Sequence, residues 1–203
     1  MVELKTSDGL KIAATYYKSN AQTRDAVILL HMLGRNRGDY SDFAARLKDS
    51  FEVIAIDFRG HGESDGNLAA FGSGDFCNFE LDVGAAKEFL EKNNKKAYAI
   101  IGGSIGANTA LNFATKNGIG QAVLLSPGLD YRGVGTEESA RKFSGRLFLA
   151  ASEDDPYSAM SVRKIYALSP AKKELKIFQN AGHGTKMFSS TDLEVQVMNW
   201  LKN

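Results

Sequence analysis

Three short segments, far apart in the chain, carry residue types that together could activate a nucleophile. The first is Gly-Gly-Ser-Ile-Gly at residues 102–106, which matches the pattern G-x-S-x-G around Ser104. An apolar run precedes it and a helical pattern follows it, which predicts a serine on a sharp turn between a strand and a helix. The outer glycines fit such a turn because the strand and the helix approach too closely for side chains. A glycine pair at a strand end is also common in simple turns, so the motif indicates chemistry only together with partners.

The second segment supplies a base. A serine hydroxyl is too weakly acidic to attack a carbonyl at neutral pH without one, and histidine suits the role. The chain has three histidines, at positions 31, 61 and 183. His183 lies in a loop with glycines on both sides, after the last predicted strand, and an open α/β sheet assembles its site at the carboxyl ends of strands. We expect His183 to be the base, and the bland alternative is a solvated loop histidine.

The third segment supplies an acid, which must hold the imidazole in one tautomer and stabilise its charged form. Residues 152–156 read Ser-Glu-Asp-Asp-Pro and follow another predicted strand. Consecutive acids could also form a solvated turn, and Asp154 and Asp155 are both candidates. The chain order of serine, then acid, then histidine is the order that strand-to-helix serine nucleophiles use. We therefore predict a catalytic triad of Ser104, Asp155 and His183.

A tetrahedral intermediate also needs hydrogen-bond donors for its negatively charged oxygen. The backbone N–H of Ile105, at the start of the predicted helix, is one expected donor. The second should come from the loop after the first central strand, which reads His-Met-Leu-Gly at residues 31–34. We assign it to the N–H of Leu33, with Met32 as the alternative, and we expect His31 to brace the loop.

Alternating strands and helices must position these loops. Short alternating segments at residues 2–5 and 11–17, around Ser-Asp-Gly, predict a hairpin. Apolar runs then predict strands at residues 26–31, 51–56, 98–101, 122–126, 146–151 and 175–178. Helical spacing predicts helices at residues 40–48, 76–93, 105–117, 137–142, 159–168 and about 193–200, the last capped by Ser190 or Thr191. The fold class is therefore α/β, with a mostly parallel central sheet of about eight strands and helices on both faces.

Composition bounds the remaining possibilities. With 203 residues, 43% hydrophobic and 24% charged, the chain is typical of one soluble globular domain over residues 1–203. The formal net charge of +1 gives no reason to expect nucleic acid or a membrane as a partner. The single cysteine, Cys77, excludes an intrachain disulfide, and its place between Phe76 and Phe79 favours a packing residue. Without a signal peptide or a spanning segment, the protein is expected to be cytoplasmic, and its oligomeric state stays open.

Together these segments resemble the α/β-hydrolase superfamily, in its small, lidless serine-esterase branch. The resemblance covers nearly the whole chain and includes residues 57–64, Asp-Phe-Arg-Gly-His-Gly-Glu-Ser, which are similar to the family's D-x-R-G-x-G-x-S turn. In relatives that turn is chiefly structural, which implies that His61 has no chemical part. A residue such as proline usually follows the family's acid, which favours Asp155 over Asp154. The resemblance implies the α/β-hydrolase fold and a mechanism with no metal and no other cofactor.

Two departures from the family pattern concern the substrate site. Met32 stands where relatives commonly have glycine, so the shape of the oxyanion loop is open. Many relatives also insert a cap domain, whereas the connection at residues 127–145 has room only for a short helix, which predicts an open site without a large cap. Each of the residues expected to form its apolar lining could also belong to the core: Met32, Leu33, Leu68, Phe71, Met187 and Phe188.

The predicted function is hydrolysis of a small carboxylic ester, the small-molecule partner, through an acyl-enzyme intermediate. A thioester, an amide or a lactone could be cleaved by the same triad. Arg35, Arg37 and Arg132 could attract a carboxylate or phosphate on the substrate, or be solvated loop charges. A ligand-binding or sensor protein that retains the fold is the alternative from another class. A dinucleotide site at residues 102–106 is disfavoured because the glycines do not form G-x-G-x-x-G.

Overall fold

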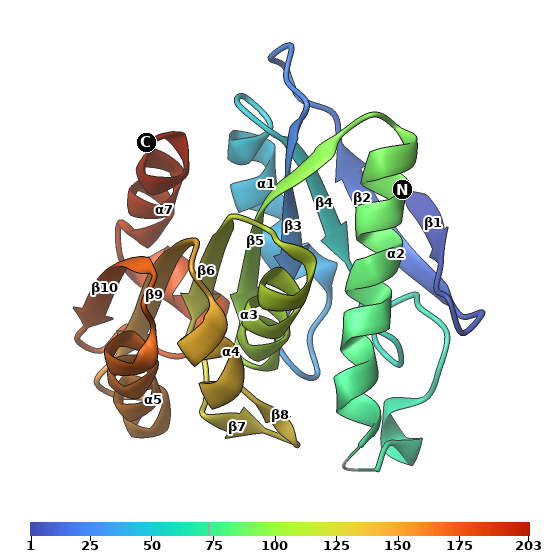
Figure 1. Cartoon of the computed structure of the whole chain (residues 1–203). Coiled ribbons are helices and arrows are strands. Elements are labelled where there is room, and N and C mark those ends of the chain that lie inside the picture. Colours follow the sequence, from blue (N-terminus) through green and yellow to red (C-terminus); the bar gives the residue numbers. More distant parts are fainter. Residues whose placement is uncertain (73) are drawn as a thin grey trace.

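An eight-stranded sheet forms the centre of the protein, whose computed structural model describes residues 1–72 and 74–203 (Figure 1). The order of its strands is β1-β2-β4-β3-β5-β6-β9-β10. The pairs β1–β2 and β2–β4 are antiparallel and all other neighbours are parallel, as predicted. Its strands are β1 (Val2–Lys5), β2 (Lys11–Tyr17), β3 (Asp25–Leu30), β4 (Glu52–Ile56), β5 (Lys96–Gly103), β6 (Gln121–Leu125), β9 (Arg146–Ser152) and β10 (Lys172–Phe178). A separate two-stranded ladder consists of β7 (Asp130–Tyr131) and β8 (Val134–Gly135).

Helices cover both faces of this sheet, which confirms the predicted arrangement. One face is covered by α2 (Phe79–Lys92), α3 (Ile105–Asn117), α4 (Glu137–Lys142) and α5 (Pro156–Leu168), the helices in front in Figure 1. The other is covered by α1 (Ser41–Leu47), α6 (Met187–Ser190) and α7 (Leu193–Lys202). Short 3₁₀ turns lie at Arg37–Tyr40, Leu68–Ala70, Asp75–Asn78 and Gly184–Lys186. In the part of the chain that the structure describes, no helix has the length and apolar character needed to cross a membrane.

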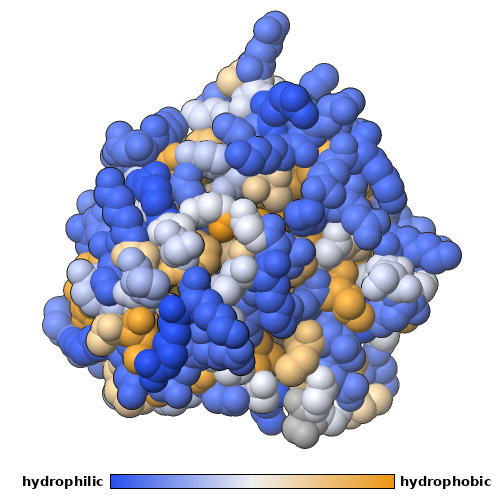
Figure 2. Space-filling model, in the orientation of Figure 1, coloured by the Kyte–Doolittle hydropathy of each residue, from blue (hydrophilic) through white to orange (hydrophobic). Residues whose placement is uncertain are grey.

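The apolar runs of the sequence reflect strands that are buried on both faces. In β3, Ile28 and Leu30 face the core under α2 and α3, whereas Val27 and Leu29 face the core under α1 and α7. All four side chains are fully buried. Because side chains alternate along a strand, both faces must be apolar, and the run is unbroken. The face of the molecule seen in Figure 2 is mostly hydrophilic.

The elements differ from the prediction mainly where short-range hydrogen bonds decide their ends. Helix α5 begins at Pro156 instead of residue 159, because Asp155 caps it by accepting the N–H of Ser158 at 3.4 Å. The β7–β8 ladder and α6 were not predicted. Helix α7 follows Asp192, so neither Ser190 nor Thr191 is its N-cap residue, although the hydroxyl of Thr191 accepts the N–H of Leu193 at 3.1 Å.

The expectation that Cys77 packs inside the protein is wrong. Its side chain is exposed, and its thiol donates to the carbonyl of Gly133 at 3.7 Å. A 3₁₀ turn at Asp75–Asn78 precedes α2, and this turn directs Phe76 into the core while Cys77 points outward. The spacing of the flanking phenylalanines therefore said nothing about the cysteine between them.

The parallel strands bring the predicted chemical residues to one edge of the sheet. Leu30 pairs with Gly102, Gly103 with Leu125, and Phe178 with Ser152, so these strands end at the same level. The loops that follow them carry the oxyanion segment, the nucleophile, the acid and the histidine. The β7–β8 ladder lies at this same edge, below the ends of the central strands in Figure 1.

Candidate active site

The turn at Ser104 has the strained geometry that the glycine pattern predicts. Ser104 has φ +55° and ψ −124° and precedes the first residue of α3. A Cβ atom on Gly102 would lie 2.1 Å from the carbonyl oxygen of Gly106, and one on Gly106 would lie 2.5 Å from that of His31. No side chain fits at either position, so both glycines are required for the sharp turn between β5 and α3.

Two backbone N–H groups lie in the segments that the sequence analysis expects to form an oxyanion hole. Ile105 is the first residue of α3, so its N–H belongs to the unpaired, electropositive end of the helix. The N–H of Gly34 in the neighbouring loop donates to Nε2 of His61 at 3.1 Å, which holds the loop in place. Within residues 1–72 and 74–203, neither Leu33 nor Ile105 has an acceptor for its N–H. Both donors are therefore available for a substrate oxygen.

His183 and Asp155 form the pair that the sequence predicts. Nδ1 of His183 donates to Oδ2 of Asp155 at 2.6 Å. The imidazole is 35% exposed and the carboxylate 18%, so the pair is reached by solvent without being fully solvated. Because the other carboxylate oxygen caps α5, the carboxylate is fixed in orientation. With its proton on Nδ1, the imidazole presents Nε2 as the acceptor that a general base needs.

The neighbouring acid, Asp154, has a different task. Its carboxylate accepts the N–H of Ala181 at 3.2 Å and that of Gly182 at 3.1 Å. It also accepts the hydroxyl of Ser152, and this hydrogen bond lowers the pKa of Asp154. Asp154 therefore holds the loop that carries the histidine, while Asp155 binds the ring itself.

Ser126 and Met32 fix the same loop from the other side. Ser126, directly after β6, accepts the N–H of Gly184 at 2.9 Å through its hydroxyl. A Cβ atom on Gly184 would lie 2.3 Å from the sulfur of Met32, and one on Gly103 would lie 3.0 Å from Cγ of Met32. The side chain of Met32 thus fills the space between the serine turn and the histidine loop. Met32 is only 6% exposed, so it shapes the site as packing and not as substrate lining.

Tyr131 lies beside the histidine, and sequence analysis missed it. Its ring makes an edge contact with the imidazole of His183, with centroids 6.3 Å apart, and its hydroxyl bonds with that of Ser158 at 2.9 Å. Burial raises the pKa of Tyr131, whereas hydrogen bonds from Ser158 and Ser104 lower it. Among the hydrogen bonds of the described residues, none joins Ser104 to His183 directly. Such catalytic hydrogen bonds are often long before a substrate binds.

The sequence contained a signal for the turn that carries Tyr131. Asp130 and Gly133 enclose it in an Asp-x-x-Gly turn, and the carboxylate of Asp130 accepts the N–H of Gly133 at 2.8 Å. This is a side chain bonding to backbone across a tight turn, a pattern typical of aspartate. The turn forms the β7–β8 ladder, which places Tyr131 over the site.

The other two histidines are occupied on both ring nitrogens. His31 donates from Nδ1 to the carbonyl of Met32 at 2.7 Å and accepts the N–H of Phe58 on Nε2 at 2.9 Å. Burial lowers the pKa of His31 to about 4. His61 donates from Nδ1 to the carbonyl of Arg59 at 3.0 Å, accepts a backbone N–H on Nε2, and has its pKa lowered by burial. Both histidines therefore brace backbone loops, as expected for these positions.

A cavity of about 330 Å³ begins at the oxyanion loop. Three of the predicted lining residues, Leu33, Leu68 and Phe71, line it. Among the residues that the structure describes, the lining consists of Leu33, Leu68, Phe71, Gly72, Phe76 and Arg132.

Two expected lining residues lie elsewhere, and the structure corrects these predictions. Met187 is fully buried in the core under α1 and α7. The ring of Phe188 packs 4.9 Å from that of Phe43 and lines a different cavity, next to α1. The 3₁₀ turn at Gly184–Lys186 and the short helix α6 that follows it direct both side chains toward that face of the sheet.

The three arginines considered for anion binding have different surroundings. Arg35 pairs with Asp39 at 2.6 Å, and Arg37 pairs with the carboxylates of Asp57 and Glu63. Arg132 makes no ion pair within the described residues, and it lines the cavity beside the oxyanion loop. The structure thus leaves Arg132 as the arginine that faces a cavity without a counter-ion.

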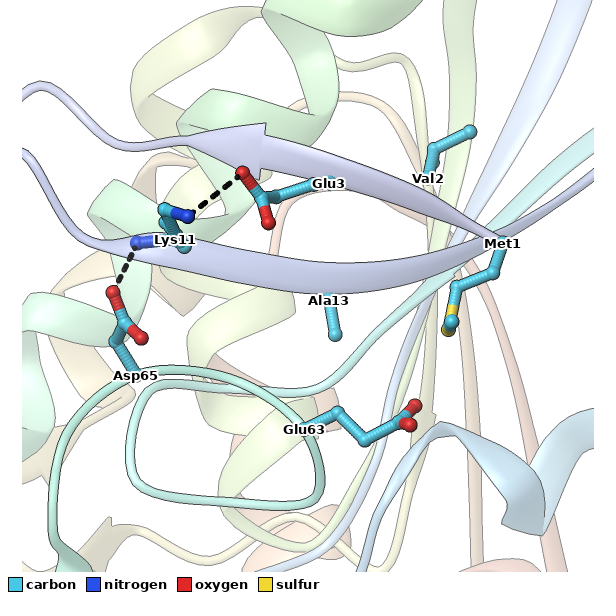
Figure 3. Close-up of a pocket in the computed structure, with 7 residues that line it drawn as sticks. All are labelled: Met1, Val2, Glu3, Lys11, Ala13, Glu63 and Asp65. Atoms are coloured by element: carbon cyan, nitrogen blue, oxygen red, sulfur yellow. Dashed lines mark hydrogen bonds and ion pairs between the residues drawn. The ribbon is translucent and has the colours of Figure 1, made fainter.

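A further cavity, of about 500 Å³, lies at the amino-terminal hairpin and contains none of the predicted site residues (Figure 3). Figure 3 shows Lys11 engaged on both sides, through Nζ to Glu3 at 3.5 Å and through its backbone N–H to Asp65 at 3.0 Å. Across the described part of the chain, no three side chains of His, Cys, Asp or Glu gather as a metal site.

The family model Hydrolase_4, described as serine aminopeptidase, S33, matches residues 21–148. The match includes the oxyanion loop and the serine turn. Uncharacterized proteins of Mycobacterium bovis and Mycobacterium tuberculosis are 30% identical over 89 residues, which is 44% of this chain and 24% of theirs. The chain spans about a quarter of the length of these curated relatives.

Solved structures match along almost the whole chain. An esterase of Pyrococcus furiosus has a TM-score of 0.82 at 22% identity, over 99% of this chain and 90% of that one. An esterase from Exiguobacterium antarcticum has a TM-score of 0.82 at 14% identity, over 100% and 99%. An N-acyl homoserine lactone degrading enzyme has a TM-score of 0.81 at 17% identity, over 98% and 100%. At such identities the likeness establishes the fold, and the predicted fold class is confirmed.

Proposed function

The chain belongs to the Hydrolase_4 family of α/β-hydrolases, and on this premise we propose that it is a serine hydrolase that cleaves small carboxylic esters through an acyl-enzyme intermediate. The observation that carries the proposal is the hydrogen bond of 2.6 Å from His183 to Asp155, at the sheet edge that also presents Ser104 on its strained turn. A carboxylate-held imidazole is suited to remove a proton from a serine hydroxyl. A solvated loop histidine would need no such partner.

In the first step, Nε2 of His183 takes the hydroxyl proton of Ser104 while the serine oxygen attacks the carbonyl carbon of the ester. The backbone N–H groups of Ile105 and Leu33 stabilise the negative charge that develops on the carbonyl oxygen. Asp155 stabilises the imidazolium that forms. His183 then gives its proton to the leaving alcohol, and the acyl group stays on Ser104.

In the second step, the same imidazole removes a proton from a water molecule that attacks the acyl group. The two N–H donors again hold the oxyanion, and collapse of the intermediate returns the proton to Ser104 and releases the acid. Every proton transfer in this cycle passes through Nε2, so Nδ1 can stay bound to Asp155 throughout.

The charge of the cavity favours an ester over the peptide substrates of an aminopeptidase. An aminopeptidase must bind a protonated amino terminus. Among the described residues that line this cavity, the charged one is Arg132, a cation, which would repel an amino terminus. A structural neighbour acts on a lactone, a cyclic ester, and the same triad chemistry would open one. A panel of acyl esters, thioesters, lactones and amides on the pure protein ranks these bonds directly.

The decisive test compares Ser104→Ala with wild type on p-nitrophenyl acetate and butyrate. We expect kcat to fall by about 10⁴-fold or more, because the nucleophile is lost, with the thermal unfolding midpoint nearly unchanged. A fluorophosphonate probe should label wild type but not Ser104→Ala. It should also label the control variant Ser189→Ala, which removes a hydroxyl that donates to the carbonyl of Lys186. Full activity of Ser104→Ala would refute the proposal, and absence of labelling in wild type would favour a ligand-binding protein.

A further inference from the structure

We propose that the cavity beside the oxyanion loop binds a carboxylate through Arg132, so that the preferred substrates are esters with a short apolar segment that ends in a carboxylate. The inference rests on the proposed function and adds the substrate class. It depends on how the arginine is held, what forms the cavity walls and which charges surround it.

A fixed turn presents the arginine. Arg132 has φ +57° and lies at the tip of the β7–β8 ladder. The buried side chain of Asn108, in α3, donates to the carbonyl of Val134 at 2.7 Å and accepts the N–H of Gly128 at 3.0 Å. The hydroxyl of Thr136 donates to the carbonyl of Gly128 at 2.9 Å. The backbone beneath the guanidinium is therefore ordered before a ligand arrives, which lowers the entropic cost of binding.

The remaining walls of the cavity are mostly apolar and begin at the oxyanion loop. Leu33 contributes its side chain to the wall and its N–H to the proposed oxyanion hole, so a bound ester would enter the cavity from that point. The rings of Phe71 and Phe76 pack edge to face with centroids 5.5 Å apart. A volume of about 330 Å³ accommodates a short chain that ends in a carboxylate.

The charges around the cavity favour an anion. Within the described residues, the guanidinium of Arg132 has no carboxylate partner, whereas Arg35 and Arg37 both have one. The nearby acids are engaged with backbone: Asp75 accepts the N–H of Gly72 at 2.7 Å, and Asp130 accepts that of Gly133. Arg132 is exposed at the mouth of these apolar walls, and a guanidinium binds a carboxylate with two parallel hydrogen bonds.

The experiment uses two pairs of esters that differ in charge but little in shape. Mono-p-nitrophenyl glutarate and p-nitrophenyl valerate place the carboxylate, or the methyl group that replaces it, on the acyl side. Acetoxybenzoate (4-isomer) and its methyl ester place the same difference on the alcohol side. We expect kcat/KM of wild type to favour the anionic member of one pair by about 10-fold or more, mainly through KM, since a positioned charge pair contributes at least that much.

The variants test whether Arg132 is the cause. Arg132→Gln keeps a polar side chain without the charge and should abolish the preference, because kcat/KM falls about 10-fold for the anionic ester and far less for its neutral partner. Arg132→Lys should restore part of the preference, because the charge returns without the planar fork. Arg35→Gln is the matched control: Arg35 is exposed and paired with Asp39, so this variant should keep the wild-type preference.

Binding without turnover separates this inference from the proposed function. Methyl hydrogen glutarate, titrated calorimetrically into Ser104→Ala, should bind about 10-fold more tightly than into Ser104→Ala/Arg132→Gln. If wild type hydrolyses none of the esters, the proposed function is wrong. The binding measurement would still show whether Arg132 binds a carboxylate. Equal kcat/KM within both ester pairs, or an anionic preference that survives Arg132→Gln, would overturn the inference.

Discussion

The histidine loop at the end of β10 and the histidine pair beside β3 use the same side chain for opposite purposes. His31 and His61 are almost fully buried, and both nitrogens of each ring bond to the protein. His183 is partly exposed, and its Nδ1 is committed to a carboxylate. A ring with both nitrogens bonded to backbone is a structural brace, and a ring with one carboxylate and one accessible nitrogen can move protons.

This difference also explains how the loops are built. The loop of His183 is held by groups other than the imidazole, namely Asp154, Ser126 and Ser152. The loop of residues 31–34 is held by the imidazoles themselves. The first arrangement leaves the imidazole of His183 available for proton transfer, whereas in the second the imidazoles of His31 and His61 hold the loop.

The largest effect is expected from replacing a histidine of each kind by glutamine and comparing the two losses of activity. His183→Gln should lower kcat on p-nitrophenyl butyrate by about 10⁴-fold or more, because no base remains for the serine. His61→Gln can keep one donor and one acceptor and should lower kcat by less than about 10-fold. Steady-state kinetics of both variants, with thermal unfolding as a folding check, measures the contrast. Comparable losses of kcat in two folded variants would contradict the division of roles.

The next effect separates the two adjacent acids. Asp155→Asn should lower kcat by about 10³- to 10⁴-fold, because the amide no longer stabilises the imidazolium and favours the wrong tautomer. Asp154→Asn keeps an oxygen for the N–H groups of Ala181 and Gly182, so kcat should fall by less than about 10-fold. The unfolding midpoint should fall more in Asp154→Asn, since Asp154 holds the loop. If Asp154→Asn has the larger effect on kcat, the assignment of Asp155 is wrong.

The sequence was most informative where local geometry demands a particular residue. Gly102 and Gly106 are dictated by backbone atoms that leave no room for a Cβ atom, so the turn around Ser104 could be predicted from its glycines. The buried parallel strands could be predicted because β3 and its neighbours need apolar side chains on both faces. Their parallel order then placed the loops of Asp155 and His183 at one edge.

The missed features depend on contacts between distant segments. The two-residue strands β7 and β8 are too short to show a period, so the Asp-x-x-Gly pattern at residues 130–133 could indicate a turn but not that Tyr131 lies beside His183. Met187 was expected to line the site, yet the 3₁₀ turn after His183 rotates it into the core. For the adjacent acids Asp154 and Asp155, the proline that follows favoured Asp155, and the hydrogen bond from His183 shows which carboxylate faces the imidazole.

The smallest expected effect concerns stability at acidic pH and tests His31 as a brace. Burial lowers the pKa of His31 from 6.5 to about 4, so between these values the unfolded chain binds a proton that the folded chain does not. The free energy of unfolding should therefore fall as the pH drops from about 6.5 toward 4, and this group should contribute about 2 kcal/mol of the loss by pH 4.5. His31→Gln can keep a donor for the carbonyl of Met32 and an acceptor for the N–H of Phe58 without titrating. Urea unfolding at pH 7 and pH 4.5 should show a smaller loss in this variant than in wild type, by about that amount. Equal losses would mean that His31 binds a proton in the folded protein as readily as in the unfolded chain. That result would contradict its role as a brace with two backbone hydrogen bonds.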